Sequence, residues 1–326
     1  MRRIIALAAA LAALSLACSA PETDSTPPVV VSQDAALGAF TSDAAGFDTH
    51  SFYWDTGREV VVFDAQFTEP LAEKLIAEIK AATKSPITYV VVTHPNPDKF
   101  NGVRPFQALG AKVVASASTA AAIPEVYAYK KYYFVELTKQ IPEEAYPKEA
   151  KVDITFQGDY VLPLEGGAEV RLHELTAAGV STTQTVAHIP ALNALIVGDL
   201  VHYKAHAWLE GGIKAGKPAP DLESWKRALD ELSVYDGAVV YGGRGASADL
   251  AEAVKAEKAY LDGMSALVTK YVADLGEKKS ELAGPEAAGH YKKITALAEE
   301  AYPEYSLSYM IEYGVYGLVD AIAAQP

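Results

Sequence analysis

One short stretch of the sequence, residues 93–102, mixes residue types that bind metal ions with residue types that do not. His94 and Asp98 offer an imidazole nitrogen and a carboxylate, and both groups ligate divalent cations. Asn96 and Lys99 stand beside them, where an amide oxygen is a weak ligand and a charged lysine cannot ligate at all. The stretch looks like a metal-binding signature that has lost most of its ligands.

The residues around this stretch predict how it is positioned. Residues 87–93 form a continuous apolar, β-branched run, which is typical of a strand buried on both faces. The proline-broken segment that follows must be the loop at its carboxyl end, and residues 103–109 predict a short helix closed by Gly110. Loops at strand ends are where α/β proteins usually place their chemistry.

The N-terminus predicts export and a lipid anchor. Residues 1–17 begin with two arginines and continue as an apolar stretch too short to span a bilayer, which is typical of a signal peptide. Cys18, the only cysteine, ends a segment that resembles a bacterial lipobox, and residues 18–45 predict a lipid-anchor site and flexible linker. We expect a periplasm-facing lipoprotein of the bacterial cell envelope, or a periplasmic or secreted protein if Cys18 is not lipidated.

The composition limits the partners of the protein. Its formal net charge is −14, and such a surface repels phosphate backbones, so nucleic acid is excluded as a partner. With a single cysteine, no disulfide can form within the chain. We expect a small-molecule ligand or an envelope protein as partner, and contact with a membrane only through the lipid anchor.

The rest of the chain predicts an α+β fold. Residues 52–64 indicate a hairpin and residues 71–82 an amphipathic helix. Short strand patterns then follow, interrupted by helical ones, and the chain from residue 248 onward is almost entirely helical. The pattern predicts a four-layer αββα sandwich over residues 46–247 with a C-terminal helical extension over residues 248–326.

The order of four short motifs resembles the metallo-β-lactamase fold superfamily, and in particular its periplasmic hydrolase-like branch. The motifs lie at residues 60–65, 93–98, 196–201 and 239–243, and the resemblance covers residues 47–245. It implies seven metal-ligand positions, most of them histidines. His94, Asp98 and Asp199 keep ligand residues, whereas Asn96, Lys99, Val180 and Arg244 occupy the other four positions.

These replacements predict a different kind of cluster. In this mapping Lys99 and Arg244 would lie near Asp98 and Asp199, where two carboxylates would otherwise repel each other. We hypothesise an internal ion-pair cluster of these four residues in place of a metal, and we expect no metal cofactor. The alternative interpretation treats Lys99 and Arg244 as ordinary solvated residues.

Two further interpretations stay open. His202 and His206 are four residues apart and form the best pair for a relocated metal site, while isolated histidines more often serve packing. Tyrosines cluster at residues 127–133, which predicts a lid or aromatic wall over the cleft. Tyr305, Tyr309, Tyr313 and Tyr316 are spaced to share one face of a C-terminal helix.

The prediction for function is therefore a member of this fold that has lost most metal ligands. It would be a non-catalytic protein, or one of altered activity, that binds a small molecule or partner in the relic cleft, which is the cleft lined by the seven former ligand positions. The alternative is a hydrolase of esters, thioesters, lactones or lactams with zinc or another divalent metal on His94, Asp98 and Asp199. A metal-free hydrolase with Lys99 or Asp98 as base is the third possibility.

Overall fold

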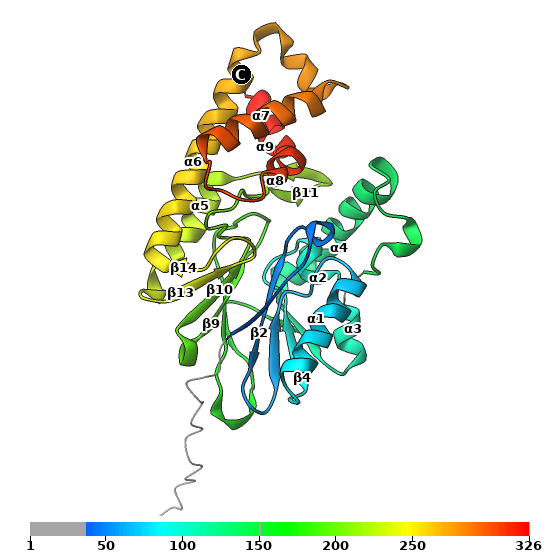
Figure 1. Ribbon diagram of the computed structural model, residues 1–326, viewed down its shortest axis with the longest axis vertical. Coiled ribbons are helices and arrows are strands. Elements are labelled where there is room, and N and C mark those ends of the chain that lie inside the picture. The colour runs from blue at the N-terminus through cyan, green and yellow to red at the C-terminus, as the bar shows by residue number, and fades with distance from the viewer. Residues whose placement is uncertain (1–36, 150, 326) are drawn as a thin grey trace, which may run out of the picture.

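Two mixed six-stranded sheets face each other in the computed structural model, which describes residues 37–149 and 151–325. Helices cover the outer face of each sheet, so the predicted four-layer sandwich is confirmed (Figure 1). The signal peptide, Cys18 and most of the linker lie outside the described residues. None of the described helices is both long and apolar enough to cross a membrane.

The first sheet has the order β1-β2-β3-β4-β5-β6. The β1, β2 and β3 strands are antiparallel neighbours, whereas β3 to β6 run parallel. Its strands are β1 Gly38–Thr41, β2 His50–Asp55, β3 Val60–Phe63, β4 Ile87–Val91, β5 Lys112–Ser116 and β6 Ile154–Phe156.

The second sheet has the order β14-β13-β10-β9-β8-β7, and only its β10 and β13 strands pair in parallel. Its strands are β7 Asp159–Val161, β8 Arg171–Glu174, β9 Thr185–Ile189, β10 Ala194–Gly198, β13 Val239–Gly242 and β14 Ala248–Asp249. A separate hairpin consists of β11 Gly212–Lys214 and β12 Lys217–Ala219.

The layers follow from the alternation of side chains along buried strands. In β3, Val60 and Val62 pack against helices on the outer face, while Val61 and Phe63 point between the two sheets. The helices on that outer face are α1 Glu69–Ala82, α3 Val103–Ala108 and α4 Ala117–Lys131. Thr68 caps α1 by accepting a hydrogen bond from the Leu71 amide.

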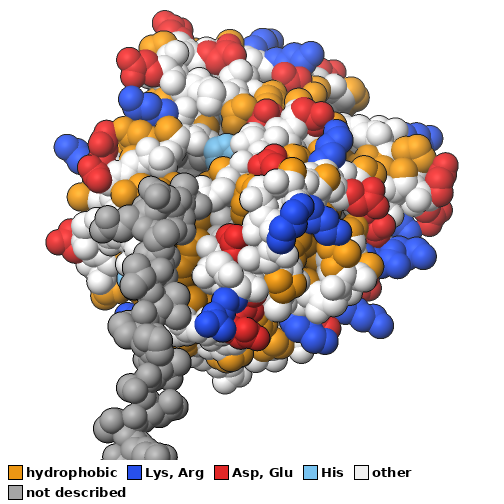
Figure 2. Space-filling view, turned by 60° about the horizontal axis from the view of Figure 1, so that its bottom comes forward, with side chains coloured by type: hydrophobic (Ala, Val, Ile, Leu, Met, Phe, Trp, Pro, Cys, Tyr) orange, Lys and Arg blue, Asp and Glu red, His pale blue; other side chains and the backbone are white. Residues whose placement is uncertain are grey.

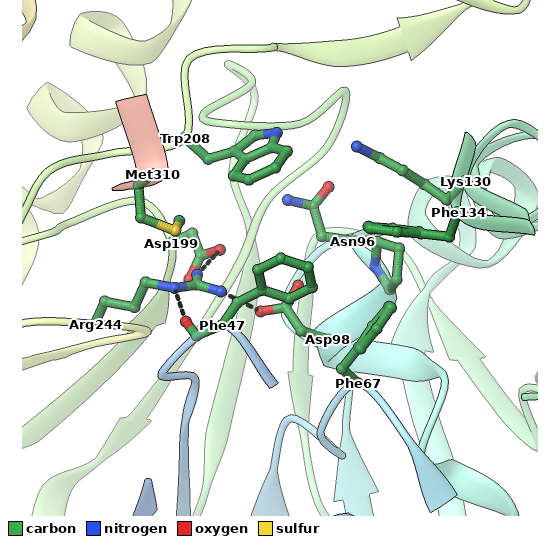
Figure 3. Close-up of a pocket in the computed structure, with 11 residues that line it drawn as sticks. Phe47, Phe67, Asn96, Asp98, Lys130, Phe134, Asp199, Trp208, Arg244 and Met310 are labelled. Carbon is green, nitrogen blue, oxygen red and sulfur yellow. Dashed lines mark hydrogen bonds and ion pairs between the residues drawn. The ribbon is translucent and has the colours of Figure 1, made fainter. Parts of the chain in front are cut away.

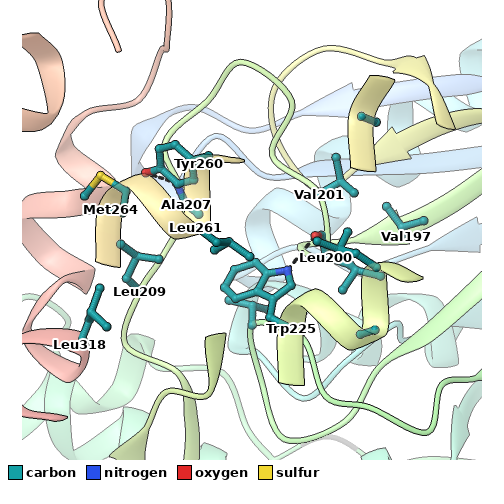
Figure 4. Close-up of a cluster of buried hydrophobic side chains, with 14 of the residues drawn as sticks. Val197, Leu200, Val201, Ala207, Leu209, Trp225, Tyr260, Leu261, Met264 and Leu318 are labelled. Atoms are coloured by element: carbon teal, nitrogen blue, oxygen red, sulfur yellow. Dashed lines mark hydrogen bonds between the residues drawn. The ribbon is translucent and has the colours of Figure 1, made fainter. Parts of the chain in front are cut away.

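The second outer layer and the C-terminal extension share one core (Figure 4). Within it, Trp225 of α5 donates its indole N–H to the Leu200 carbonyl at 2.9 Å, and Tyr260 of α6 accepts from the Ala207 amide. The helices here are α5 Leu222–Glu231, α6 Leu250–Asp274, α7 Ala287–Ala301, α8 Tyr309–Gly314 and α9 Tyr316–Ala323. The extension is therefore packed against the sandwich as part of the same core.

Four sequence predictions need correction. The linker does not reach residue 45, because Gly38–Thr41 pairs with β2 as strand β1. Residues 248–249 belong to the second sheet as β14, so the helical extension begins at Leu250. The sequence pattern predicts a helix over residues 118–123 that ends before Pro124, but α4 continues to Lys131, since Ile123 and Val126 bury one face against the first sheet.

The fourth correction concerns the C-terminal tyrosines, which do not share one helix face. Leu307 has a left-handed φ of 62°, and Tyr309 and Tyr316 belong to two short helices rather than one. Tyr305 stacks on Tyr260, outside both helices. The spacing fitted a continuous helix that the backbone does not form.

Acidic and basic side chains are interspersed on the face of the molecule shown in Figure 2. No continuous basic stretch is visible on that face, in keeping with the net charge of −14.

Candidate functional site

The chemically important residues lie at the carboxyl ends of three strands. His94 follows β4, Asp199 directly follows β10, and Arg244 follows β13. Asp98 and Lys99 lie in the short helix α2, Pro97–Phe100, rather than in the open loop that the sequence predicted. The two sheets therefore bring these segments together at one edge of the sandwich.

Backbone contacts hold this edge tightly closed. The Gly243 amide donates to the Gly198 carbonyl at 2.7 Å, and the Thr185 amide donates to the Thr93 carbonyl at 2.7 Å. Gly198 has a φ of 52°, and a side chain there would meet Thr93 Oγ1 at 2.4 Å. Glycine is needed at this position both for the backbone conformation and for the close approach.

Four charged side chains form a closed network at the centre of the site, and we call it the ion-pair cluster: Asp98, Lys99, Asp199 and Arg244. Lys99 Nζ lies 2.9 Å from Asp98 Oδ2 and 2.8 Å from Asp199 Oδ1. The Arg244 guanidinium donates to Asp199 Oδ2 at 2.7 Å and to Asp98 Oδ2 at 3.0 Å (Figure 3). Each cation thus contacts both carboxylates.

All four side chains are buried, with exposed fractions of 0% for Lys99 and 2% for Arg244. The hypothesised ion-pair cluster is therefore present, and the interpretation of both cations as solvated residues is wrong. Gly243 makes room for it, because a Cβ atom there would lie 1.9 Å from Asp199 Oδ1.

The cluster keeps its members charged. Burial alone would raise the pKa of Asp98, but Lys99 and Arg244 outweigh burial and lower that pKa to about 2. Burial would also raise the pKa of Asp199, but Arg244 and Lys99 outweigh burial and hold that pKa well below its ordinary value. Burial would lower the pKa of Lys99, yet the two carboxylates leave it raised. At neutral pH the cluster carries two positive and two negative charges.

Surrounding groups position the cluster from the side of the first sheet. Arg244 Nε donates to the Phe47 carbonyl at 2.7 Å, and Arg244 Nη2 donates to Thr49 Oγ1 at 2.9 Å. Thr49 in turn donates its hydroxyl proton to Asp98 Oδ2 at 2.8 Å. The guanidinium is thus fixed by four oxygen acceptors on three segments of the chain.

His94 is held by a second buried group. Its Nδ1 lies 2.9 Å from Thr93 Oγ1, which donates to Asp64, and the Thr93 amide also donates to Asp64. Burial raises the pKa of Asp64 to about 6. The other ring nitrogen, Nε2, faces Asp199 Oδ2 at 3.6 Å, which is longer than an ordinary hydrogen bond.

An inner pocket lies above the cluster (Figure 3). Asp98, Asp199 and Arg244 form its floor, and Asn96 and Lys130 also line it. Its walls are apolar and consist of Phe47, Phe67, Pro97, Phe134, Trp208 and Met310. Its volume is about 30 Å³, which is room for about one or two water molecules. Met310 comes from α8, so the C-terminal extension closes one side of the pocket.

The sequence profile of the Metallo-beta-lactamase superfamily matches residues 45–244 of this chain. This match covers more than half of the chain and includes the cluster and every strand of the two sheets except the edge strands β1 and β14.

The chain belongs to the metallo-beta-lactamase superfamily.

Solved structures of this superfamily share the fold. A metallo-beta-lactamase from Pontibacter korlensis is 23% identical, with a TM-score of 0.51 over 69% of this chain and 94% of that one. The mono-zinc form of the metallo-beta-lactamase FIM-1 from Pseudomonas aeruginosa is 17% identical, with a TM-score of 0.51 over 70% and 89%. No match was found among curated proteins. At these identities the structures support the fold alone.

The superfamily usually binds zinc, and the residues present here do not fit that metal. Lys99 places an ammonium between the two carboxylates that would bind it, and Arg244 adds a guanidinium. Val180 is packed in the apolar core with Leu200 and does not line the inner pocket. Over residues 37–149 and 151–325, no three His, Cys, Asp or Glu side chains are grouped to hold a metal ion.

The relocated metal site that the sequence left open is not formed by these histidines either. His206 Nδ1 lies 3.1 Å from the Tyr260 hydroxyl, and His202 Nδ1 lies 3.7 Å from Glu257 Oε1. Both imidazoles are fully buried in the core beside α6. Their spacing of four residues reflects packing.

Several residues of the site were not singled out from the sequence. Asp64 directly follows strand β3, and its place there, within the motif at residues 60–65, was the signal that could have identified it. Phe47, Phe67 and Trp208 come from separate loops, and no spacing links them. The tyrosine-rich segment 127–133 was recognised, and of its tyrosines Tyr133 lines a groove beside the inner pocket, while none of them lines the inner pocket itself.

Proposed function

We propose that this chain is a metal-independent member of the superfamily that binds a small molecule at the former metal cleft. The observation that supports the proposal is the position of Lys99. Its ammonium lies within 3 Å of both Asp98 and Asp199, the carboxylates that a metal would need. The cluster would keep the strand-end loops in place without a Lewis acid.

The energetics of the cluster support this interpretation. A divalent cation close to Lys99 and Arg244 would be repelled by both, and the repulsion is strong where water is excluded. Removing a cation from its partners would also leave a buried charge without compensation, which costs about 3–5 kcal/mol. The free energy of metal binding would thus have to offset both this repulsion and the cost of separating the cation from its carboxylates.

A reduced metal site on His94, Asp98 and Asp199 is the second candidate. The free Nε2 of His94, 3.6 Å from Asp199, is the observation in its favour. Such a protein would hydrolyse an ester, thioester, lactone or lactam, as the resemblance implies. It would require Lys99 to leave the space between the carboxylates.

The metal-free hydrolase is disfavoured by the charges of its proposed bases. A carboxylate with a pKa of about 2, as in Asp98, is a weak base at neutral pH. The carboxylates raise the pKa of Lys99, so its amine stays protonated and cannot accept a proton. We therefore propose a binding function rather than catalysis.

We place this function in the bacterial cell envelope, at the end of a lipid anchor on Cys18. The proposal rests on the sequence of residues 1–18 alone. An acyl-anchored protein of this kind would face the periplasm and meet ligands there.

The test is turnover of ester, thioester, lactone and β-lactam substrates by the purified protein. Zinc, manganese or iron is added in parallel samples, and a chelator is added in others. We expect no turnover beyond that of an Asp199→Asn variant prepared in the same way. Turnover that needs metal, and that both the chelator and Asp199→Asn abolish, would overturn the proposal in favour of the reduced metal site.

A further inference from the structure

We propose that an aromatic groove beside the inner pocket binds an uncharged, planar aromatic molecule. The inference deepens the proposed function, on which it rests, by naming the class of ligand. We call this site the outer groove, and six aromatic rings line it: Phe47, Phe67, Tyr133, Phe134, Trp208 and Tyr313. Its volume is about 310 Å³, at the lower end of the range for small-molecule sites.

The outer groove lies directly against the site already described. Phe47, Phe67, Phe134 and Trp208 line both the groove and the inner pocket. The inner pocket, at about 30 Å³, has no room for an organic ligand. A ligand of the cleft therefore has to lie in the outer groove, with these four rings between it and the ion-pair cluster.

The charge of the lining determines the charge of the ligand. None of the side chains that line the groove is acidic, basic or histidine, although charged residues make up 21% of the chain. The nearby ammonium of Lys130 is already paired with Glu210, which also accepts the Trp208 indole N–H at 2.7 Å. A charged ligand would lose its hydration here without gaining a counter-ion.

The arrangement of the rings favours a flat ligand. Phe47 meets Phe67 and Trp208 edge to face, at centroid distances of 5.1 and 5.9 Å, so the wall presents both ring faces and ring edges. Aromatic ligands bind such surfaces by stacking and by edge contacts. The Gln140 amide and the hydroxyls of Tyr133 and Tyr313 can bond to a carbonyl or hydroxyl group on the ligand.

A π-helical turn at the end of α4 builds part of this wall. Residues Tyr132–Leu137 form the turn, and it brings both Tyr133 and Phe134 to the groove. Such turns are rare and occur frequently at functional sites. Tyr313 of α8 also lines the groove and is 45% exposed, so the C-terminal extension supplies part of the lining.

N-phenyl-1-naphthylamine, an uncharged fluorescent molecule, is a suitable probe. The protein is prepared without residues 1–17 and with Cys18→Ser, so that no acyl chain or detergent competes for the dye. We expect saturable binding at one site per chain. The sulfonated analogue 8-anilinonaphthalene-1-sulfonate has the same ring system and should bind at least about tenfold more weakly, because the groove offers its charge no partner.

Two pairs of variants locate the probe. Ala45→Phe adds a ring at an exposed alanine that lines the groove, and it should abolish binding. Ala251→Phe, at an exposed alanine of α6 outside the groove, should leave binding unchanged. Tyr313→Ala should weaken binding about two- to tenfold, whereas Tyr132→Ala, 58% exposed and outside the lining, should not.

The inference is overturned if the uncharged probe does not bind, if the sulfonate binds equally well, or if Ala45→Phe binds like the parent. Metal content is measured on the same preparation. If the protein holds one equivalent of metal and also binds the probe, the proposed metal independence is rejected but the inferred class of ligand is retained. If the protein holds no metal and does not bind the probe, the inferred class of ligand is rejected but metal independence is retained.

Discussion

At the scale of single residues, the Lys99 ammonium lies between two carboxylates that would otherwise repel each other. Arg244 reaches the same two carboxylates from the second sheet. It donates hydrogen bonds to one oxygen of each carboxylate, to the Phe47 carbonyl and to the Thr49 hydroxyl. Buried ion pairs of this kind add little net stability, because desolvation offsets attraction. Breaking one is costly, however, since the remaining charges stay buried.

Arg244→Ala should therefore destabilise the protein by about 3–5 kcal/mol, because Asp98 and Asp199 would lose a shared cation. The measurement is the free energy of unfolding in urea. Arg104→Ala is the matched control, since Arg104 pairs with Glu69 at the surface and its side chain is 42% exposed. We expect at most about 1 kcal/mol there. Equal effects of both changes would contradict the importance of the cluster.

How far the sequence predicted the site depended on whether a residue lay in a recognisable motif. His94, Asp98 and Asp199 and the two cations were identified because their motifs occur in a fixed order. The prediction that Val180 lies in the cleft was wrong, since its side chain is part of the apolar core. The part of the aromatic wall formed by Phe47, Phe67 and Trp208 could not be predicted, because these three residues meet only in three dimensions.

At the scale of elements, Glu210 ties α4 and α9 to the segment that carries Trp208. It accepts hydrogen bonds from Lys130 of α4, from Trp208 and from Tyr316 of α9. Lys130 also lies 5.1 Å from the centre of the Trp208 ring. The inner pocket, the outer groove and the extension thus share one buried polar contact.

Glu210→Ala should cost about 3–5 kcal/mol, because it leaves Lys130 buried without its carboxylate. It should also make residues 302–325 more sensitive to limited proteolysis. The neighbouring pair on the same helix end, Lys131 with Glu143, is exposed and provides the control. Glu143→Ala should change stability by at most about 1 kcal/mol. An unchanged digestion pattern in Glu210→Ala would show that α9 is held by its apolar contacts alone.

The elements were predicted well where the sequence pattern is clear, as in the continuous apolar run of residues 60–63 and the helical period of residues 71–82. Prediction failed where packing overrides a local rule. Pro124 lies inside α4 because the residues on both sides of it share a buried face. The C-terminal tyrosines have helical spacing, yet Leu307 has a left-handed backbone conformation and Tyr305 lies outside the helices.

At the scale of the whole molecule, the pH dependence of stability reports on the buried carboxyls. Burial raises the pKa of Asp64 to about 6, against about 4 in the unfolded chain. The folded state binds more protons between these values, so the contribution of Asp64 is complete below about pH 4 and is lost as pH rises through about 6. The cluster carboxylates stay charged over this whole range.

Comparison with Asp64→Asn isolates this effect. The stability of the parent relative to the variant should fall by about 3 kcal/mol between pH 4 and pH 7. Urea unfolding at several pH values measures it. A difference that does not change with pH would mean that Asp64 is already ionised in the folded protein at pH 4.

The central claim, that an ion-pair cluster stands where the superfamily holds metal, is tested most directly by metal stoichiometry. The purified protein is incubated with zinc, manganese or iron, dialysed and analysed by mass spectrometry. A variant with Asn96→His, Lys99→His and Arg244→His serves as the matched control and should retain about one equivalent of zinc. The account predicts that the parent chain retains far less than one equivalent of any of the three metals. A full equivalent bound to the parent, and lost in Asp199→Asn, would contradict it.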